Sequence, residues 1–117
     1  MPKYLLLLHA DPTTFVRMSP EEMRRAIQPY AAWTKKLRDS GILLGSHKLR
    51  DEPGKVMRGA GAKTRVTDGP FSETKEILGG YYLIEAPNYE AATEIARDCP
   101  QLDHGGTIEV REVQELM

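Results

Sequence analysis

The sequence has few of the residues on which several classes of protein depend, and cysteine is among the scarcest. The chain of 117 residues contains one cysteine, Cys99, so no disulfide can form within it, which predicts a reducing, cytoplasmic setting. The apolar run near the start, residues 4–8, is far too short to cross a bilayer. No small-residue cleavage site follows this run, so we expect a first strand there rather than a signal peptide, and no membrane partner.

An excess of positive charge is also missing. The chain carries 16 Lys and Arg residues against 17 Asp and Glu residues, for a formal net charge of −1. Proteins that bind nucleic acid directly neutralise phosphates with a surplus of basic side chains. The charge balance therefore argues against direct nucleic-acid binding.

Motifs for metals and phosphate-bearing cofactors are missing as well. The three histidines, His9, His47 and His104, have unrelated spacings, and no second cysteine can complete a pair of metal ligands. The glycines within residues 59–61 are not followed by the Lys-Ser or Lys-Thr of a phosphate-binding loop. We therefore expect neither a metal site nor an organic cofactor.

What the sequence contains is the pattern of a single α+β domain spanning residues 1–117. Ser19 and Glu22 form a capping box in front of an amphipathic helix that ends at Gly41. Asn88 is a suitable cap for a second helix. Apolar or alternating runs predict strands at residues 4–9, 42–49, 77–86 and 107–113.

A hairpin is predicted between the second and third of these strands, with arms at residues 55–58 and 64–67. The order is then β-α-β, an inserted hairpin, and β-α-β, which is the pattern of a ferredoxin-like βαββαβ fold. Two helices can cover one face of a four-stranded antiparallel sheet, so the other face needs a cover. Many small proteins of this shape supply it by packing two sheets together as a dimeric α+β barrel, and we therefore expect a homodimer.

Two adjoining segments carry a family resemblance, namely residues 68–76 (DGPFSETKE) and residues 79–85 (GGYYLIE). Supporting segments are residues 41–45 (GILLG), 96–100 (ARDCP) and 108–111 (IEVR). Together they resemble the YCII-related proteins of the DGPF type over nearly the whole chain. The resemblance implies a dimeric α+β barrel. It implies no particular reaction, because the family has no settled general activity.

The chain departs from some members of that family in its first helix. Some YCII-related proteins are thought to use a histidine there beside an acidic residue, and residues 20–40 of this chain contain no histidine. Tyr30 is the nearest polar-tipped aromatic side chain, and Asp39 is an acid near the end of the helix. Both are candidate ligand-binding residues.

Further candidate site residues come from several segments. Those for proton transfer are His9, Asp68 and His104, because histidine and carboxylate side chains are the usual acids and bases. Those for ligand binding, besides Tyr30 and Asp39, are His47, Phe71, Glu76 and Arg111.

Each candidate also has a structural interpretation. Asp68 can have no role other than to shape a turn, and Phe71 can simply anchor its loop. Glu76 belongs to a charged cluster of the kind that usually faces solvent. His104, in the predicted turn of residues 103–106, and His9, at a strand end, can be ordinary hydrogen-bonded histidines.

Two functions fit these features. The first is a homodimer that binds a small organic molecule in a cleft near the DGPF segment and transforms it by acid–base chemistry without a cofactor, with Arg111 holding an anion. The second is a non-enzymatic regulatory protein. Some DGPF-type proteins are associated with extracytoplasmic-function sigma factors, so the resemblance allows a link to sigma-factor-dependent transcription through protein contacts.

Overall fold

The computed structural model describes residues 1–14, 16–69 and 76–116. The main body contains two helices and four strands in the predicted order. They are β1 (Lys3–Ala10), α1 (Pro20–Asp39), β2 (Leu43–Lys48), β5 (Ile77–Glu85), α2 (Tyr89–Arg97) and β6 (Thr107–Glu112). Within the described residues, no helix is long and apolar enough to cross a membrane.

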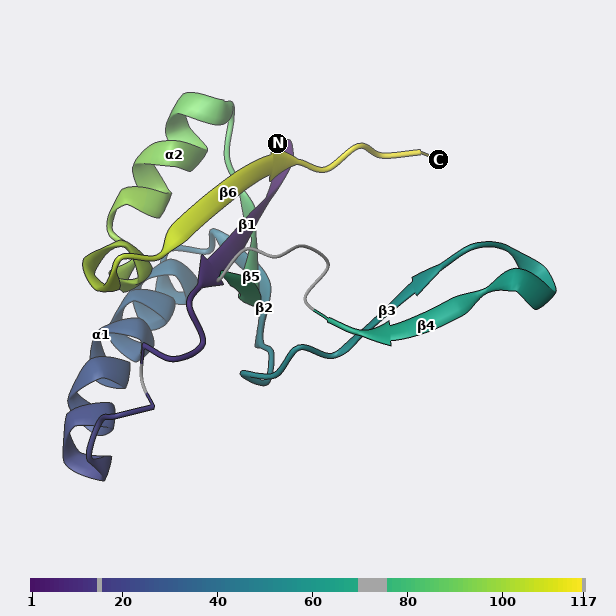
Figure 1. Ribbon diagram of the computed structural model, residues 1–117. Coiled ribbons are helices and arrows are strands. Elements are labelled where there is room, and N and C mark those ends of the chain that lie inside the picture. The colour runs from purple at the N-terminus through teal and green to yellow at the C-terminus, as the bar shows by residue number, and fades with distance from the viewer. Residues whose placement is uncertain (15, 70–75, 117) are drawn as a thin grey trace.

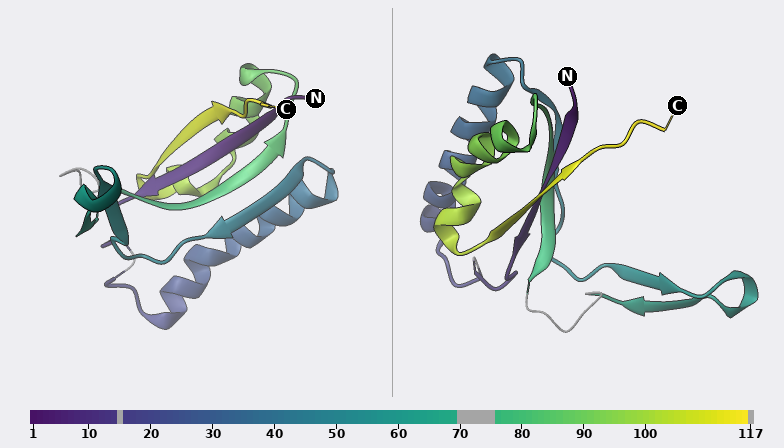
Figure 2. Two further views of the ribbon diagram at one scale, coloured as in Figure 1. Left: turned by 90° about the vertical axis from the view of Figure 1, so that its right-hand side faces the viewer. Right: turned by 90° about the horizontal axis from the view of Figure 1, so that it is seen from above.

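The four strands form one antiparallel sheet in the order β2-β5-β1-β6. This order, with α1 and α2 packed on the same face, is the ferredoxin-like α+β arrangement that the sequence predicts (Figure 1). Figure 2 shows the other face of the sheet without a helix. The described residues therefore leave one broad face of the sheet without a helix, as expected.

The core lies between the sheet and the two helices because β1 alternates. Tyr4, Leu6 and Leu8 point toward the helices and are buried, whereas the residues between them are only partly buried on the open face. Trp33 of α1 and Ala92 of α2 complete the same cluster. The alternation of one strand thus separates a core face from an open face.

The ends of both helices form as their sequences predict. The Ser19 hydroxyl accepts from the Glu22 N–H at 3.1 Å, and the Glu22 carboxylate accepts from the Ser19 N–H at 3.3 Å. Gly41 follows α1 with a φ of +76°, a backbone conformation that favours glycine. Asn88 caps α2 by accepting from the Ala91 N–H at 2.8 Å.

Cys99, which follows α2, lies in the core. Its side chain is buried, and burial raises the pKa of the thiol to about 11. The thiol is therefore protonated at neutral pH, which makes it a poor nucleophile.

The inserted hairpin forms a separate two-stranded sheet that projects from the body (Figures 1 and 2). It consists of β3 (Lys55–Arg58) and β4 (Arg65–Asp68), joined by the short helix η1 (Gly61–Lys63). We call residues 55–68 the arm. The arm explains a radius of gyration of 16.1 Å, compared with about 13 Å for a compact domain of this length.

Two local predictions need correction. Asp68 was predicted in the turn after the hairpin, but it is the last residue of β4, where it lies opposite Lys55 and forms an ion pair with it. Opposite charges that face each other across a strand pair stabilise that register. His104 was predicted in a flexible turn, but it ends the short helix η2 (Pro100–His104), which Gly105 terminates with a φ of +77°.

Candidate functional site

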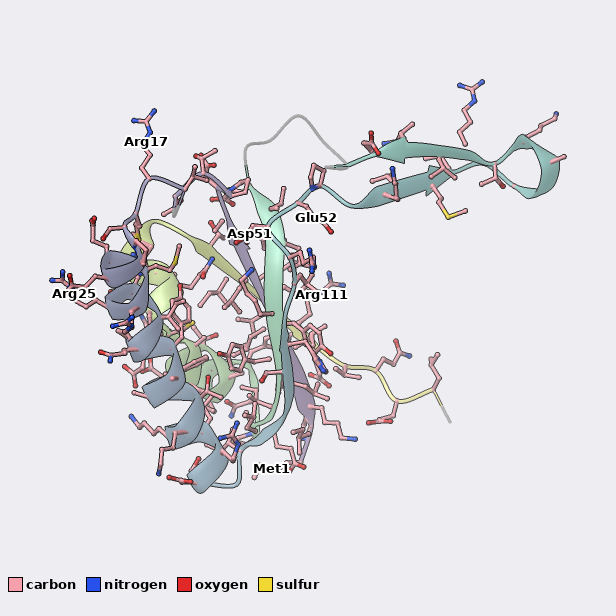
Figure 3. All side chains as sticks on the ribbon, turned by 90° about the horizontal axis from the view of Figure 1, so that it is seen from below. Met1, Arg17, Arg25, Asp51, Glu52 and Arg111 are labelled. Carbon is pink, nitrogen blue, oxygen red and sulfur yellow. The ribbon has the colours of Figure 1, made fainter. Side chains whose placement is uncertain are left out.

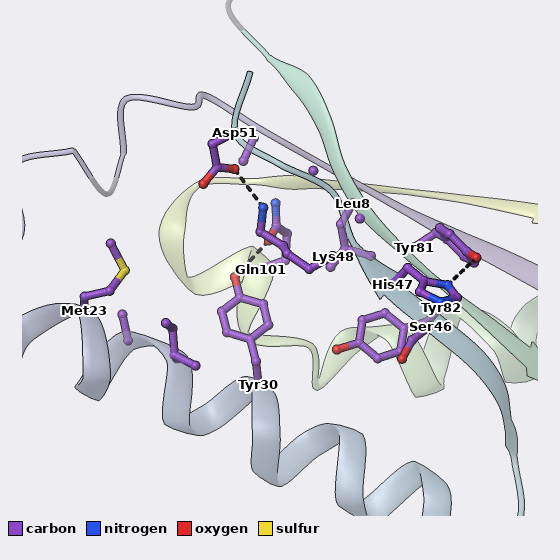
Figure 4. A pocket seen from close by; sticks show the side chains of 15 residues that line it. Leu8, Met23, Tyr30, Ser46, His47, Lys48, Asp51, Tyr81, Tyr82 and Gln101 are labelled. Carbon is purple, nitrogen blue, oxygen red and sulfur yellow. Dashed lines mark hydrogen bonds and ion pairs between the residues drawn. The ribbon is translucent and has the colours of Figure 1, made fainter. Parts of the chain in front are cut away.

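A cavity of about 410 Å³ lies between α1 and the helix-covered face of the sheet (Figure 4). This volume is within the usual range of small-molecule sites, about 300–1,000 Å³. Its walls come from β1, α1, β2, β5 and η2. The lining residues are Leu8, Ala10, Met23, Ala26, Ile27, Tyr30, Ser46, His47, Lys48, Asp51, Gly79, Gly80, Tyr81, Tyr82 and Gln101.

Tyr30 and Gln101 are joined at the wall of this cavity. The Tyr30 hydroxyl donates to Gln101 Oε1 at 2.8 Å, and Gln101 Nε2 donates to the carbonyl of His9 at 2.9 Å. Gln101 is only 7% exposed. A Cβ atom at Gly106 would lie 2.6 Å from Gln101 Nε2, so the glycine leaves the room that the amide occupies. Gln101 is therefore held in place from three sides.

Tyr82 is held by a second network. Its hydroxyl lies 2.7 Å from Thr34 Oγ1, and Thr34 Oγ1 donates to the carbonyl of Tyr30 at 2.7 Å. The ring of Tyr82 packs edge-on against Trp33, with the ring centroids 4.7 Å apart. Tyr30 and Tyr82 are thus fixed by contacts from α1 and η2.

Burial sets the charge state of both phenols. Burial raises the pKa of Tyr30 to about 12, with the nearby Cys99, Tyr82 and Asp103 adding to the shift. Burial also raises the pKa of Tyr82, although its hydrogen bond with Thr34 acts in the opposite direction. Both side chains are therefore neutral at physiological pH.

A charged pair stands at the edge of the cavity (Figure 4). Lys48 Nζ donates to Asp51 Oδ1 at 2.8 Å and also to the carbonyl of Leu49. Both charged side chains are mostly exposed. They give the otherwise apolar cavity a polar rim.

The three histidines take different places around the cavity. His47 is one of the lining residues, but its ring lies on the open face opposite Tyr81, with Nδ1 2.6 Å from the Tyr81 hydroxyl. His104 stacks on the ring of Tyr30, with centroids 6.2 Å apart and the planes 12° from parallel. His9 contributes its backbone carbonyl to the Gln101 network, while its ring lies elsewhere.

The ring of His9 belongs to a polar cluster on the open face of the sheet. His9 Nε2 lies 3.2 Å from Glu109 Oε1, and Arg111 Nη1 donates to Glu109 Oε2 at 3.2 Å. The hydrogen bonds with Arg111 and then with His9 hold the pKa of Glu109 below its ordinary value. Figure 3 shows Arg111 on the side of the sheet away from α1. The predicted residues His9 and Arg111 are thus brought together by Glu109.

Three other candidates lie apart from the cavity lining. Asp39 pairs with Lys35 at 2.6 Å near the exposed end of α1. Asp68 is on the arm, with its side chain 78% exposed. Glu76 accepts from the Thr107 hydroxyl at 3.1 Å. Their roles toward a ligand stay predictions, as does that of Phe71, which lies outside the described residues.

Several residues of the site were not predicted from the sequence. Thr34 and Tyr82 lie within the predicted first helix and third strand, and neither prediction pointed to a cavity. Gln101 carried no signal beyond its place after Pro100. Glu109 had a usable signal, because strand alternation places it on one face with Arg111.

Among the residues that the structure describes, no group of three or more His, Cys, Asp or Glu side chains could hold a metal ion. The polar groups that converge on the cavity are instead phenol, hydroxyl and amide groups. These groups suit an organic ligand.

Comparison with known proteins assigns the family. A model of the YCII-related domain matches residues 2–117, so the chain belongs to the YCII-related family. A relative is the uncharacterized protein R00369 of Rhizobium meliloti (strain 1021), which is 33% identical over 110 residues, or 92% of this chain and 89% of that protein.

A solved structure shares the fold. It is 5-chloro-2-hydroxyhydroquinone dehydrochlorinase (TftG) from Burkholderia phenoliruptrix AC1100, in complex with 2,5-dihydroxybenzoquinone. The TM-score is 0.51 at 15% identity, and the match covers 96% of this chain and 93% of that one. This likeness shows the ferredoxin-like fold. Neither the family description nor these two proteins support the predicted link to sigma-factor-dependent transcription.

Proposed function

We propose that this protein binds a small planar organic molecule in the cavity between α1 and the sheet. The observation that carries this proposal is the convergence of Tyr30, Tyr82 and Gln101 on a cavity of about 410 Å³ whose other walls are largely apolar. Apolar side chains such as Met23 and Ile27 can enclose a ring, while the fixed polar groups orient it. The related fold of TftG, whose complex contains 2,5-dihydroxybenzoquinone, supports the same class of ligand.

We assign the chemical step to proton transfer without an organic cofactor, with His104 as the transferring group. Histidine is the usual acid–base side chain in proteins. Of the three histidines, His104 stacks on Tyr30 of the cavity, whereas the rings of His47 and His9 lie with Tyr81 and Glu109 on the open face. Resorcinol is a suitable probe because its activated ring exchanges C–H for C–D in D₂O. The wild type should accelerate this exchange, and His104→Gln should bind resorcinol without accelerating it.

We further propose that the protein is a cytoplasmic homodimer whose sheets pack through their open faces. Leu5, Leu7 and Leu83 lie on that face and are partly exposed in the single chain. Covering them would remove apolar surface from water. In the dimer, the DGPF segment would border the ligand site. This placement is supported by Gly79 and Gly80, which come shortly after residues 68–76 in the chain and line the cavity.

A substitution that fills the cavity tests the binding proposal. Ala26 lines the cavity, whereas Ala31, five residues later in α1, is exposed. We expect resorcinol to shift the amide resonances of Ser46, Gly79 and Gly80 in the wild type and in Ala31→Trp, but not in Ala26→Trp. Equal binding by both tryptophan variants would rule out the cavity as the site.

A further inference from the structure

The hydrogen bonds around the cavity have fixed directions, and these directions define what a ligand must offer. A backbone carbonyl can only accept a hydrogen bond. Because the His9 carbonyl faces the Gln101 side chain at 2.9 Å, the Gln101 NH₂ group must point toward it. Gln101 Oε1 then faces Tyr30 and can only accept, so the single hydroxyl hydrogen of Tyr30 is donated to Gln101.

The same reasoning fixes the hydrogen of Tyr82. Thr34 has one hydroxyl hydrogen, and it is donated to the carbonyl of Tyr30 at 2.7 Å. The 2.7 Å contact between Thr34 Oγ1 and the Tyr82 hydroxyl must therefore use the hydrogen of Tyr82. Tyr82 donates to Thr34, just as Tyr30 donates to Gln101.

The network resists reversal. If the Gln101 amide turned over, its oxygen would face the His9 carbonyl, and two acceptors would lie 2.9 Å apart in a buried place. A buried polar group without a partner costs about 1–3 kcal/mol. Both phenol hydrogens are thus committed to the protein, and each phenol oxygen retains only accepting capacity.

We propose that the cavity selects planar rings that carry hydrogen-bond-donating hydroxyl groups, as in benzenediols, over rings of the same shape whose oxygens only accept. Tyr30 and Tyr82 would accept from the ligand hydroxyls. An aryl ether, a quinone or a carboxylate offers these two oxygens no hydrogen. This inference rests on the proposed binding site and names the ligand class for it.

Lys48 fits the same ligand class. Its ammonium group has three hydrogens, of which two are directed to Asp51 and the Leu49 carbonyl. A ligand hydroxyl that donates to a phenol can also accept from Lys48. A hydroxyl group matches this combination of acceptors and donor because it both donates and accepts.

The test compares hydroquinone with its dimethyl ether, 1,4-dimethoxybenzene, by titration of ¹⁵N-labelled protein. The measured quantity is the ratio of the Kd of the ether to the Kd of the diol. This ratio is compared between the wild type and each variant, so that the different hydrophobicity of the two ligands cancels. Thr34→Val keeps the side-chain shape but frees the Tyr82 hydrogen to donate to a ligand. We expect it to lower the ratio about fivefold, the effect of one neutral hydrogen bond.

Two variants complete the test. Thr34→Ser retains the hydroxyl and should keep the wild-type ratio. Tyr82→Phe deletes the accepting oxygen, so it should weaken the binding of hydroquinone about fivefold and leave the affinity for the ether unchanged. This variant decides the question if Thr34→Val does not fold. The inference is overturned, while the binding site stands, if Thr34→Val leaves the ratio unchanged or raises it. It is also overturned if Tyr82→Phe binds the ether more weakly than the wild type does. If neither ligand shifts the cavity residues of the wild type, the proposed function fails and the inference fails with it.

Discussion

Gln101 and Tyr30 are 71 positions apart in the chain, yet their side chains share a hydrogen bond of 2.8 Å. The bond connects η2, which follows the second helix, to the middle of α1. Because Gln101 also donates to the His9 carbonyl, one buried side chain joins three segments beside the cavity.

Replacing Gln101 by methionine should destabilise the protein. The Tyr30 hydroxyl and the His9 carbonyl would both lose their partner in a buried place, at a cost of about 1–3 kcal/mol in the free energy of unfolding. Urea denaturation measures this loss. Gln28→Met, at an exposed position of α1, is the matched control and should change the free energy by less than about 0.5 kcal/mol. Equal effects of the two substitutions would contradict the role of Gln101.

The protein should lose stability at alkaline pH, in part through Tyr30. Burial raises the pKa of Tyr30 from its ordinary 10.0 to about 12. Above pH 10 the unfolded chain releases the phenol proton and the folded chain retains it, so stability falls as the pH rises through about 12. Tyr30→Phe should show a shallower fall over this window in urea denaturation at a series of pH values. Parallel curves for the two proteins above pH 10 would contradict this assignment.

Substitution of Leu7 by glutamate should convert a dimer to a monomer. Leu7 lies on the open face, opposite Tyr81 of β5 and Glu109 of β6. A charge buried there without a partner would oppose sheet-to-sheet packing. Light scattering should give twice the chain mass for the wild type at micromolar concentration and the single mass for the variant. Leu102→Glu, at an exposed position of η2, should stay dimeric; a monomeric wild type would exclude the proposed assembly.

The buried area is a second measure of that assembly. An interface between two open sheet faces should bury more than about 1,000 Å² in total. A crystal structure of the protein would show whether the faces meet. Dimer contacts confined to the arm would require a different arrangement of the two subunits.

Asp68→Asn should change the melting temperature little. The carboxylate is 78% exposed and pairs with an exposed Lys55, and surface ion pairs contribute about 0–1 kcal/mol. Affinity for resorcinol should also be unchanged if Asp68 serves only the arm. Weaker binding at an unchanged melting temperature would instead show that its charge serves the ligand site, as the sequence interpretation allowed.

Most of the fold could be predicted from residues close together in the chain. The capping box at Ser19, the Asn88 cap and the alternation of β1 and β6 each depend on neighbours within a few positions. Such signals predict where helices and strands lie, and their order then predicts the ferredoxin-like sheet. The family resemblance of residues 68–76 and 79–85 was equally local, and the match to the YCII-related domain confirms it.

The candidate site could be predicted only in part. Tyr30 was named as the polar-tipped residue of the first helix, and it is central to the cavity. His47 was named and also lines it. Gln101, Thr34 and Tyr82 were missed, because no local pattern distinguishes a polar residue that reaches a cavity from one that faces solvent.

The sequence by itself thus determined the elements of this protein and their order. Only the tertiary structure decided which polar groups meet. The direction of the hydrogen bond from Tyr82 to Thr34 depends on the carbonyl of Tyr30, and the orientation of Gln101 depends on the carbonyl of His9. These partners are 48 and 92 positions apart. Packing of the whole chain brings them within bonding distance, so their geometry appears only in the folded molecule.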